Sequence, residues 1–125
     1  MNLLLDTHVL IWVRAGDPRL PDHFRTAIAE PTNKKFISAI TAAEIAVKTT
    51  VGKLQAPAEI TRSLEHLGFD ELPFTHQHAQ VLASLPLLHR DPFDRMLIAQ
   101  ALADDLTFLS VDSAVHQYKV KLLHP

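Results

Sequence analysis

Short apolar runs alternate along the chain with longer segments in which apolar residues recur at helical spacing. The runs show little of the polar alternation of a strand with one face in water, so they are typical of strands buried on both faces. They predict strands at residues 2–6, 35–40, 70–74, 106–111 and 119–123. Such strands separated by helices indicate an α/β fold. We expect one three-layer α/β/α domain over residues 1–125, with a central, mainly parallel sheet of about five strands.

Helix signals lie between these runs. Ile60, Leu64 and Leu67 follow the i, i+4, i+7 spacing of one helix face. Pro21 is suited to open a helix that reaches about residue 29, and Thr75 is suited to cap a helix that reaches about residue 85. The segments between the strands are therefore long enough to cover both faces of the sheet.

The segment HRDPFDRMLIAQALA, residues 89–103, has a charged first half and an apolar second half. Asp91 followed by Pro92 predicts a helix with aspartate at the N-cap and proline at the first helical position. We expect the body of this helix to pack against the sheet, while its charged start lies at the edge of the sheet. The residues expected to pack are Phe93, Met96, Leu97, Ile98 and Leu102.

The composition excludes several kinds of chemistry. The 125 residues contain no cysteine, which excludes disulfide bonds, thiolate catalysis and cysteine-ligated metal centres. The formal net charge is −2, so bulk charge does not predict a nucleic-acid-binding protein. A polyanionic partner would have to be held locally or through metal ions.

The apolar N-terminal segment does not resemble a signal peptide. It has no basic residue before its apolar stretch, and Asp6 and His8 interrupt it. No window of the sequence approaches the roughly 20 apolar residues of a transmembrane helix. We therefore expect a folded cytoplasmic protein that makes no use of a membrane.

Acidic residues from distant parts of the chain are expected to gather at one edge of the sheet. In open parallel sheets, ligands bind beyond the carboxyl ends of the strands. Asp6 ends the first predicted strand, and Asp112 follows the fourth apolar run. Glu44 lies about one turn past the second strand, and Asp94 lies in the first turn of the helix that leads into the fourth. These four carboxylates are our candidate catalytic and metal-binding residues.

Such crowding of carboxylates is unfavourable without a cation. Two unit charges ~5 Å apart repel by about 3 kcal/mol at an effective dielectric constant near 20. Oxygen ligands without cysteine suit Mg²⁺ or Mn²⁺. A bound ion of this kind lowers the pKa of its water and stabilises in-line displacement at phosphorus. The acids therefore predict metal-dependent attack of water on a phosphodiester.

Each acid also has a structural explanation. Asp94, at the third helical position, would complement the helix dipole, and Glu44 could simply pair with Lys48 at i, i+4. Asp6 and Asp112 could each cap the helix that follows. The functional interpretation depends on all four acids sharing one edge.

Histidine and aromatic residues are expected to be structural. His8 is expected to be a hydrogen-bonded polar residue that faces away from the neighbours of Asp6. Trp12 and Phe24 fall on apolar helix faces, which favours core packing over base stacking. His76 and His78 lack zinc-like spacing to a further ligand, so we expect them to be surface or half-buried residues.

Four segments together resemble the VapC-type toxins of the PIN-domain ribonuclease family. They are LLLDTHVLIW, ISAITAAEIAVKTTVGKL, HRDPFDRMLIAQA and LSVDSAV, in this order, and the resemblance extends from Asn2 to about Val115. It implies a metal-dependent endoribonuclease with a parallel sheet. The acids of the family correspond to Asp6, Glu44, Asp94 and Asp112, and Asp91 matches an additional acid of the HRDPFDR subgroup, with an accessory role.

The resemblance also implies partners. Toxins of this type cleave RNA, often transfer RNA or ribosomal RNA, are usually homodimers, and are neutralised by a VapB-type antitoxin whose C-terminal segment crosses the active site. Ser110 stands where the family often has threonine, and its hydroxyl or that of Thr7 could hold a carboxylate or a metal-bound water. Arg95 could contact an RNA phosphate or pair with an acid, and the ion pair is favoured. A catalytically silent PIN-like module that binds RNA or protein is the alternative function.

Overall fold

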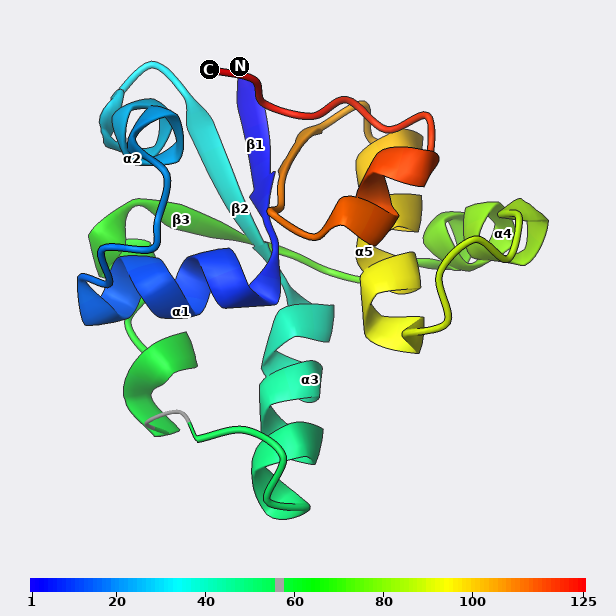
Figure 1. Cartoon of the computed structure of the whole chain (residues 1–125), viewed down its shortest axis with the longest axis horizontal. Coiled ribbons are helices and arrows are strands. Elements are labelled where there is room, and N and C mark those ends of the chain that lie inside the picture. The colour runs from blue at the N-terminus through cyan, green and yellow to red at the C-terminus, as the bar shows by residue number, and fades with distance from the viewer. Residues whose placement is uncertain (56–57) are drawn as a thin grey trace.

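The computed structural model describes residues 1–55 and 58–125 (Figure 1). All strand pairs are parallel, in the order β3-β2-β1-β4. The strands are β1 (Asn2–Leu5), β2 (Lys34–Ser38), β3 (Phe69–Leu72) and β4 (Thr107–Leu109). The helices are α1 (Thr7–Ala15), α2 (Asp22–Ala29), α3 (Ala39–Thr50), α4 (His76–Ser84) and α5 (Pro92–Ala103), with short 3₁₀ helices η1 (Ala58–Thr61), η2 (Glu65–Leu67) and η3 (Ser113–Gln117).

Strand β1 shows why the fold has three layers. Successive side chains of a strand point to opposite faces of the sheet. Leu3 and Leu5 accordingly belong to the apolar cluster that contains residues of α1 and α2, whereas Leu4 belongs to the cluster that contains Leu97 and Ile98 of α5. Figure 1 shows α1 and α2 on one side of the sheet and α5 on the other, with α4 outside α5. The α/β/α architecture predicted from the apolar runs is confirmed.

The predicted fifth strand is reduced to a single bridge. Within 119–123, Leu122 pairs with Phe108 as an isolated parallel bridge, and the Phe108 amide donates to the carbonyl of Lys121 at 2.8 Å. Val120 is buried, whereas Lys119 and Lys121 are exposed. This alternation matches a segment covered on one side, which packs onto the core without extending the ladder. The sheet of the described residues therefore has four strands.

The prediction of a continuous helix through Ile60, Leu64 and Leu67 is also wrong. The segment forms the two short 3₁₀ helices η1 and η2, and Ser63 between them has a left-handed backbone with φ of 58°. Ile60 is buried and Leu64 packs against the core, but Leu67 is 46% exposed. The apolar spacing here reflects two separate contacts with the core and no continuous helical face.

Other local predictions are confirmed. Helix α4 begins after Thr75, whose hydroxyl accepts from the His78 amide in a capping box, and α2 ends at Ala29 as expected. Asp91 caps α5 through the amides of Phe93 and Asp94. One residue of the α5 body differs, because Leu102 is exposed.

His78 is buried, which corrects the expectation of a surface or half-buried residue. Its Nδ1 accepts from the Thr75 amide at 3.0 Å, so the ring hydrogen lies on Nε2, which donates to Asp104 at 2.9 Å. Gln100 is also buried, and its carbonyl oxygen accepts from the Ser38 hydroxyl. These polar contacts join the end of β2, α4 and α5 beneath the sheet.

No helix in the described part of the chain combines the length and the apolar character needed to cross a membrane.

Candidate catalytic cleft

The register of β1 and β4 brings Asp6 and Ser110 together. Leu5 pairs with Leu109, so the next residue of each strand lies at the same edge of the sheet. The Ser110 hydroxyl donates to Asp6 Oδ2 at 2.7 Å, and the Thr7 amide donates to Oδ1 at 2.7 Å. Asp6 is therefore both the N-cap of α1 and a buried carboxylate fixed from two sides.

Glu44 reaches the same edge from α3. It is buried, and the Thr7 hydroxyl donates to its Oε1 at 2.6 Å. Lys48, one turn later, donates to its Oε2 at 2.5 Å. The i, i+4 ion pair considered from sequence is thus present, but it lies inside the acidic cluster, because Lys48 Nζ is also 3.4 Å from Asp91 Oδ2.

Helix α5 contributes Asp91 and Asp94. Asp91 Oδ1 accepts from the amides of Phe93 and Asp94, so one oxygen caps the helix while the other faces Lys48. Asp94 lies in the first helical turn, and its Oδ2 is 2.7 Å from His89 Nε2. The start of this helix is charged because it opens onto the cluster of acids.

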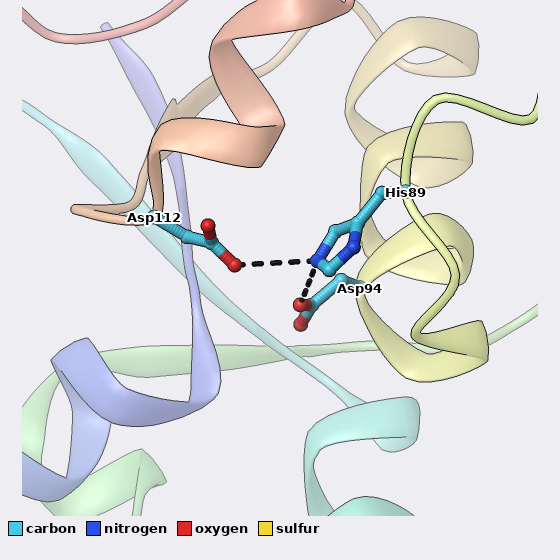
Figure 2. A group of neighbouring side chains, drawn as sticks. All are labelled: His89, Asp94 and Asp112. Atoms are coloured by element: carbon cyan, nitrogen blue, oxygen red, sulfur yellow. Dashed lines mark hydrogen bonds and ion pairs between the residues drawn. The ribbon is translucent and has the colours of Figure 1, made fainter.

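Asp112 approaches from the chain that follows β4. Its Oδ1 accepts from the Ala114 amide and caps η3, while its own amide donates to the Ser110 hydroxyl at 3.2 Å. Its Oδ2 lies 3.2 Å from His89 Nε2. The imidazole therefore bridges Asp94 and Asp112, which are separated in the sequence by the rest of α5 and by β4 (Figure 2).

These side chains line one cleft of about 280 Å³. The structure brings the four candidate acids and Asp91 together at its walls. It adds residues that we did not assign to the site from sequence, because no local pattern distinguished them. The complete lining comprises Asp6, His8, Trp12, Glu44, Lys48, His89, Asp91, Asp94, Val111 and Asp112.

Burial, together with crowding, raises the pKa of two of the acids. Burial, followed by the negative charges of Asp6 and Asp91, raises the pKa of Asp94 to about 7, although the hydrogen bond from His89 opposes this rise. Burial also raises the pKa of Asp6, against the hydrogen bonds from Ser110 and Thr7. The Asp6 and Asp94 carboxyl groups thus ionise less readily than isolated ones, because the pKa of each is raised.

The pKa values of two basic side chains are raised as well. Burial lowers the pKa of His89, but its hydrogen bond to Asp94 and the charges of Asp94 and Asp112 outweigh burial, so the pKa is raised. The pKa of Lys48 is raised in the same way by Glu44 and Asp91, against burial. Both cations therefore stand between carboxylates and offset part of their repulsion.

The donor set suits a hard divalent cation. Two groups of three residues each place one possible ligand atom per residue within 4.8 Å of one another: Glu44, Asp91 and Asp94, and His89, Asp94 and Asp112. Asp94 belongs to both groups. Most of these ligand atoms are carboxylate oxygens, the donors that Mg²⁺ and Mn²⁺ prefer. Lys48 and His89 already place basic groups beside these oxygens.

Arg95 does not line the cleft, and the prediction that it pairs with an acidic residue is wrong. Its guanidinium donates to the carbonyl of Pro86 at 2.9 Å and to the Tyr118 hydroxyl at 3.0 Å, and it makes none of the ion pairs found within 1–55 and 58–125. One position past Asp94, it turns away from the acids. The same hydroxyl accepts from the His89 amide at 3.0 Å, so Arg95 supports the loop that carries His89.

His8 departs from its expected position, and the expected core packing of Trp12 is confirmed only in part. His8 is exposed and lines the cleft, where its charge lowers the pKa of Asp6. Trp12 does pack against the core, but it is only partly buried and also lines the cleft. Phe24, by contrast, lies wholly in the core, as expected.

Comparison with known proteins places this geometry in a family. A model of the PIN domain family matches residues 3–121. A search of curated protein sequences gives no significant match. Among solved structures, the chain is similar to VapBC2 from Rickettsia felis bound to a promoter DNA fragment, with a TM-score of 0.72, 16% identity, and coverage of 99% of this chain and 98% of that chain.

Two further structures share the fold. DNA-bound VapBC from Salmonella typhimurium matches with a TM-score of 0.70 and 18% identity, covering 98% of this chain and 97% of that chain. FitAcB from Neisseria gonorrhoeae matches with a TM-score of 0.67 and 20% identity, covering 98% and 96%. The family match covers nearly the whole chain, including the parallel sheet and its acidic edge. This chain therefore belongs to the PIN domain family.

Proposed function

We propose that this chain is a metal-dependent endoribonuclease toxin of the VapC type, acting as a single PIN domain in the cytoplasm. The observation that carries the proposal is the convergence of Asp6, Glu44, Asp94 and Asp112 on one cleft from α1, α3, α5 and the end of β4. Carboxylates this close repel one another unless a cation is bound. The oxygen donors favour Mg²⁺ or Mn²⁺.

The chain's own residues would hold and orient the reacting groups. Asp6, Glu44, Asp94 and Asp112 would hold the metal ion, with Asp91 in support. When bound, the ion supplies a water of lowered pKa and stabilises charge at the phosphorus. Ser110 and Thr7 keep the Asp6 and Glu44 carboxylates in position through short hydrogen bonds. No serine or histidine nucleophile is required.

An acidic cleft explains how a chain of net charge −2 would take an RNA substrate. The phosphates would be met by metal ions, and bulk positive charge is not needed. Transfer RNA or ribosomal RNA is the substrate that the similarity to VapC toxins favours. Solved structures similar to this chain include complexes named VapBC, which supports a VapB-type antitoxin as partner. A basic antitoxin side chain would complement the acids, and we propose a homodimer as the toxin's assembly.

The test is cleavage of labelled RNA in Mg²⁺ or Mn²⁺, compared with EDTA. We expect Asp94→Asn and Asp6→Asn to abolish cleavage, and Asp22→Asn to retain it, because the Asp22 side chain is almost fully exposed on α2. Equal cleavage in every sample would contradict the proposal. RNA binding without metal-dependent cleavage would instead favour the catalytically silent module.

A further inference from the structure

We propose that Trp12 and His8 form a nucleobase-stacking wall of the cleft, which holds one unpaired base of the RNA beside the carboxylates. This inference rests on the proposed function, since it concerns how that cleft holds its substrate. Both residues lie on α1, one helical turn apart, and both line the cleft. Their ring centroids are 6.4 Å apart, with the ring planes inclined by 59°.

The wall begins beside a candidate catalytic acid. Asp6 is the N-cap of α1, so His8 follows it by two residues and Trp12 by one further turn. A base on this wall would thus belong to a nucleotide adjacent to the phosphate at the acids. Val111, the residue before Asp112, is 46% exposed and also lines the cleft. It adds apolar surface to the lining.

Trp12 is held in place before any ligand binds. The Arg19 guanidinium carbon lies 5.3 Å from the centroid of its ring. Asp17 fixes Arg19 through hydrogen bonds from the arginine amide at 2.8 Å and from Nη2 at 2.8 Å. The Asp17 amide in turn donates to the Trp12 carbonyl at 2.9 Å. Because Trp12 also packs against the apolar core, its ring loses little conformational freedom when a base stacks on it.

The charge of the cleft explains why such a wall is needed. Within the cleft, Asp6, Glu44, Asp91, Asp94 and Asp112 repel a polyanion. Stacking on an aromatic ring contributes to binding of single-stranded RNA without depending on charge and tolerates any base, because every base has a π-face. The Arg19 side chain, which is 71% exposed, places a guanidinium beside the ring, and its ion pair with Asp17 offsets part of that charge.

The chain allows a direct measurement, because Trp12 is its single tryptophan. We expect a single-stranded oligoribonucleotide to quench the intrinsic fluorescence of the wild-type chain in EDTA, or of Asp94→Asn in Mg²⁺, where cleavage does not consume the ligand. An abasic ribose-phosphate oligomer of equal length has the same charge but no base, so it should leave the fluorescence unchanged. Equal quenching by both oligomers, or quenching by neither, would contradict stacking.

Kinetics provide the second measurement. We expect Trp12→Leu to raise KM for RNA cleavage about tenfold or more with kcat changed little, and Trp12→Phe to restore much of the affinity. The matched control is Phe24→Leu, which shortens a core aromatic outside the cleft and should lower thermal stability without raising KM. An unchanged KM in Trp12→Leu would overturn the inference while leaving the nuclease intact. Absence of RNA cleavage by the wild-type chain would overturn the proposed function, and quenching would then still decide whether a base stacks on Trp12.

Discussion

The imidazole of His89 lies 2.7 Å from the carboxylate of Asp94, and the pKa of each group is raised above its ordinary value. The carboxylate holds a proton more tightly because it is buried among other acids. The imidazole holds one more tightly because those acids attract it. Positive charge is therefore retained at this point of the cleft, although the protein as a whole is slightly acidic.

We expect Asp94→Asn to stabilise the metal-free chain above about pH 7. The pKa of Asp94 is about 7 in the folded chain against an ordinary value of 3.8, so the folded state binds the proton more tightly than the unfolded state. The stability from this proton is complete below pH ~4 and is lost as the pH rises through about 7. An amide avoids that loss, which is worth about 1–2 kcal/mol after discounting for partial solvent exposure.

The measurement is thermal unfolding in EDTA between pH 4 and 8. The gain in Asp94→Asn should grow with pH and become small near pH 4, where Asp94 is protonated in the folded state and about half protonated in the unfolded state. Asp22→Asn, on the exposed surface of α2, should show no such trend. A gain for Asp94→Asn that is constant across the range would contradict a raised pKa.

We expect Thr7→Val to destabilise the chain by about 1–3 kcal/mol, because the buried Glu44 carboxylate loses the hydroxyl that donates to it at 2.6 Å. The change in side-chain volume is small, so packing is nearly preserved. Urea unfolding at pH 7 measures the loss. Thr7→Ser keeps the hydroxyl and should lose much less, so equal losses in the two variants would show that the hydrogen bond contributes little.

We expect His78→Ala to lower stability by about 2–4 kcal/mol while leaving cleavage by the folded fraction unchanged. The substitution removes a buried ring together with its bonds to the Thr75 amide and to Asp104. His76→Ala is the matched control, since His76 is an exposed residue of the same helix and should change stability by no more than about 0.5 kcal/mol. Similar unfolding midpoints for the two variants would contradict a structural role of His78.

The sequence predicted those parts of the site that follow directly from the ends of strands and helices. Asp6 and Asp112 follow β1 and β4, and the carboxyl ends of parallel strands meet at one edge. Asp94 was predictable because the N-cap Asp91 fixes where α5 begins. These positions depend on local signals together with the parallel order of the strands.

The remaining parts of the site depend on contacts that no local pattern encodes. His89 faces Asp94 because the Tyr118 hydroxyl holds its backbone from 29 residues away. Trp12 has the apolar spacing of a core residue and packs against the core, and only the position of α1 at the edge of the cleft also makes it part of the lining. The same limitation applies to residues 119–123, since pairing with Phe108 depends on how the final segment packs and not on its apolar content.

His89 also allows a test of how metal and imidazole share the cleft. Its Nε2 lies between Asp94 and Asp112, at 2.7 and 3.2 Å, where a cation bridging these carboxylates would be placed. Mg²⁺ prefers oxygen ligands, so the imidazole should compete with this ion and not bind it. We therefore expect His89→Ala to be less stable without metal, because the two acids lose their positive neighbour, and to bind Mg²⁺ more tightly than the wild-type chain.

Isothermal titration with Mg²⁺, together with the Mg²⁺-induced rise in unfolding temperature, measures this difference. His116→Ala, in η3 and outside the lining of the cleft, is the control and should bind Mg²⁺ as the wild-type chain does. Weaker Mg²⁺ binding by His89→Ala would instead show that the imidazole is a ligand of the ion, as its place in a group with Asp94 and Asp112 allows. The two outcomes differ in sign, so the direction of the change alone decides whether His89 is displaced by the metal or retains contact with it.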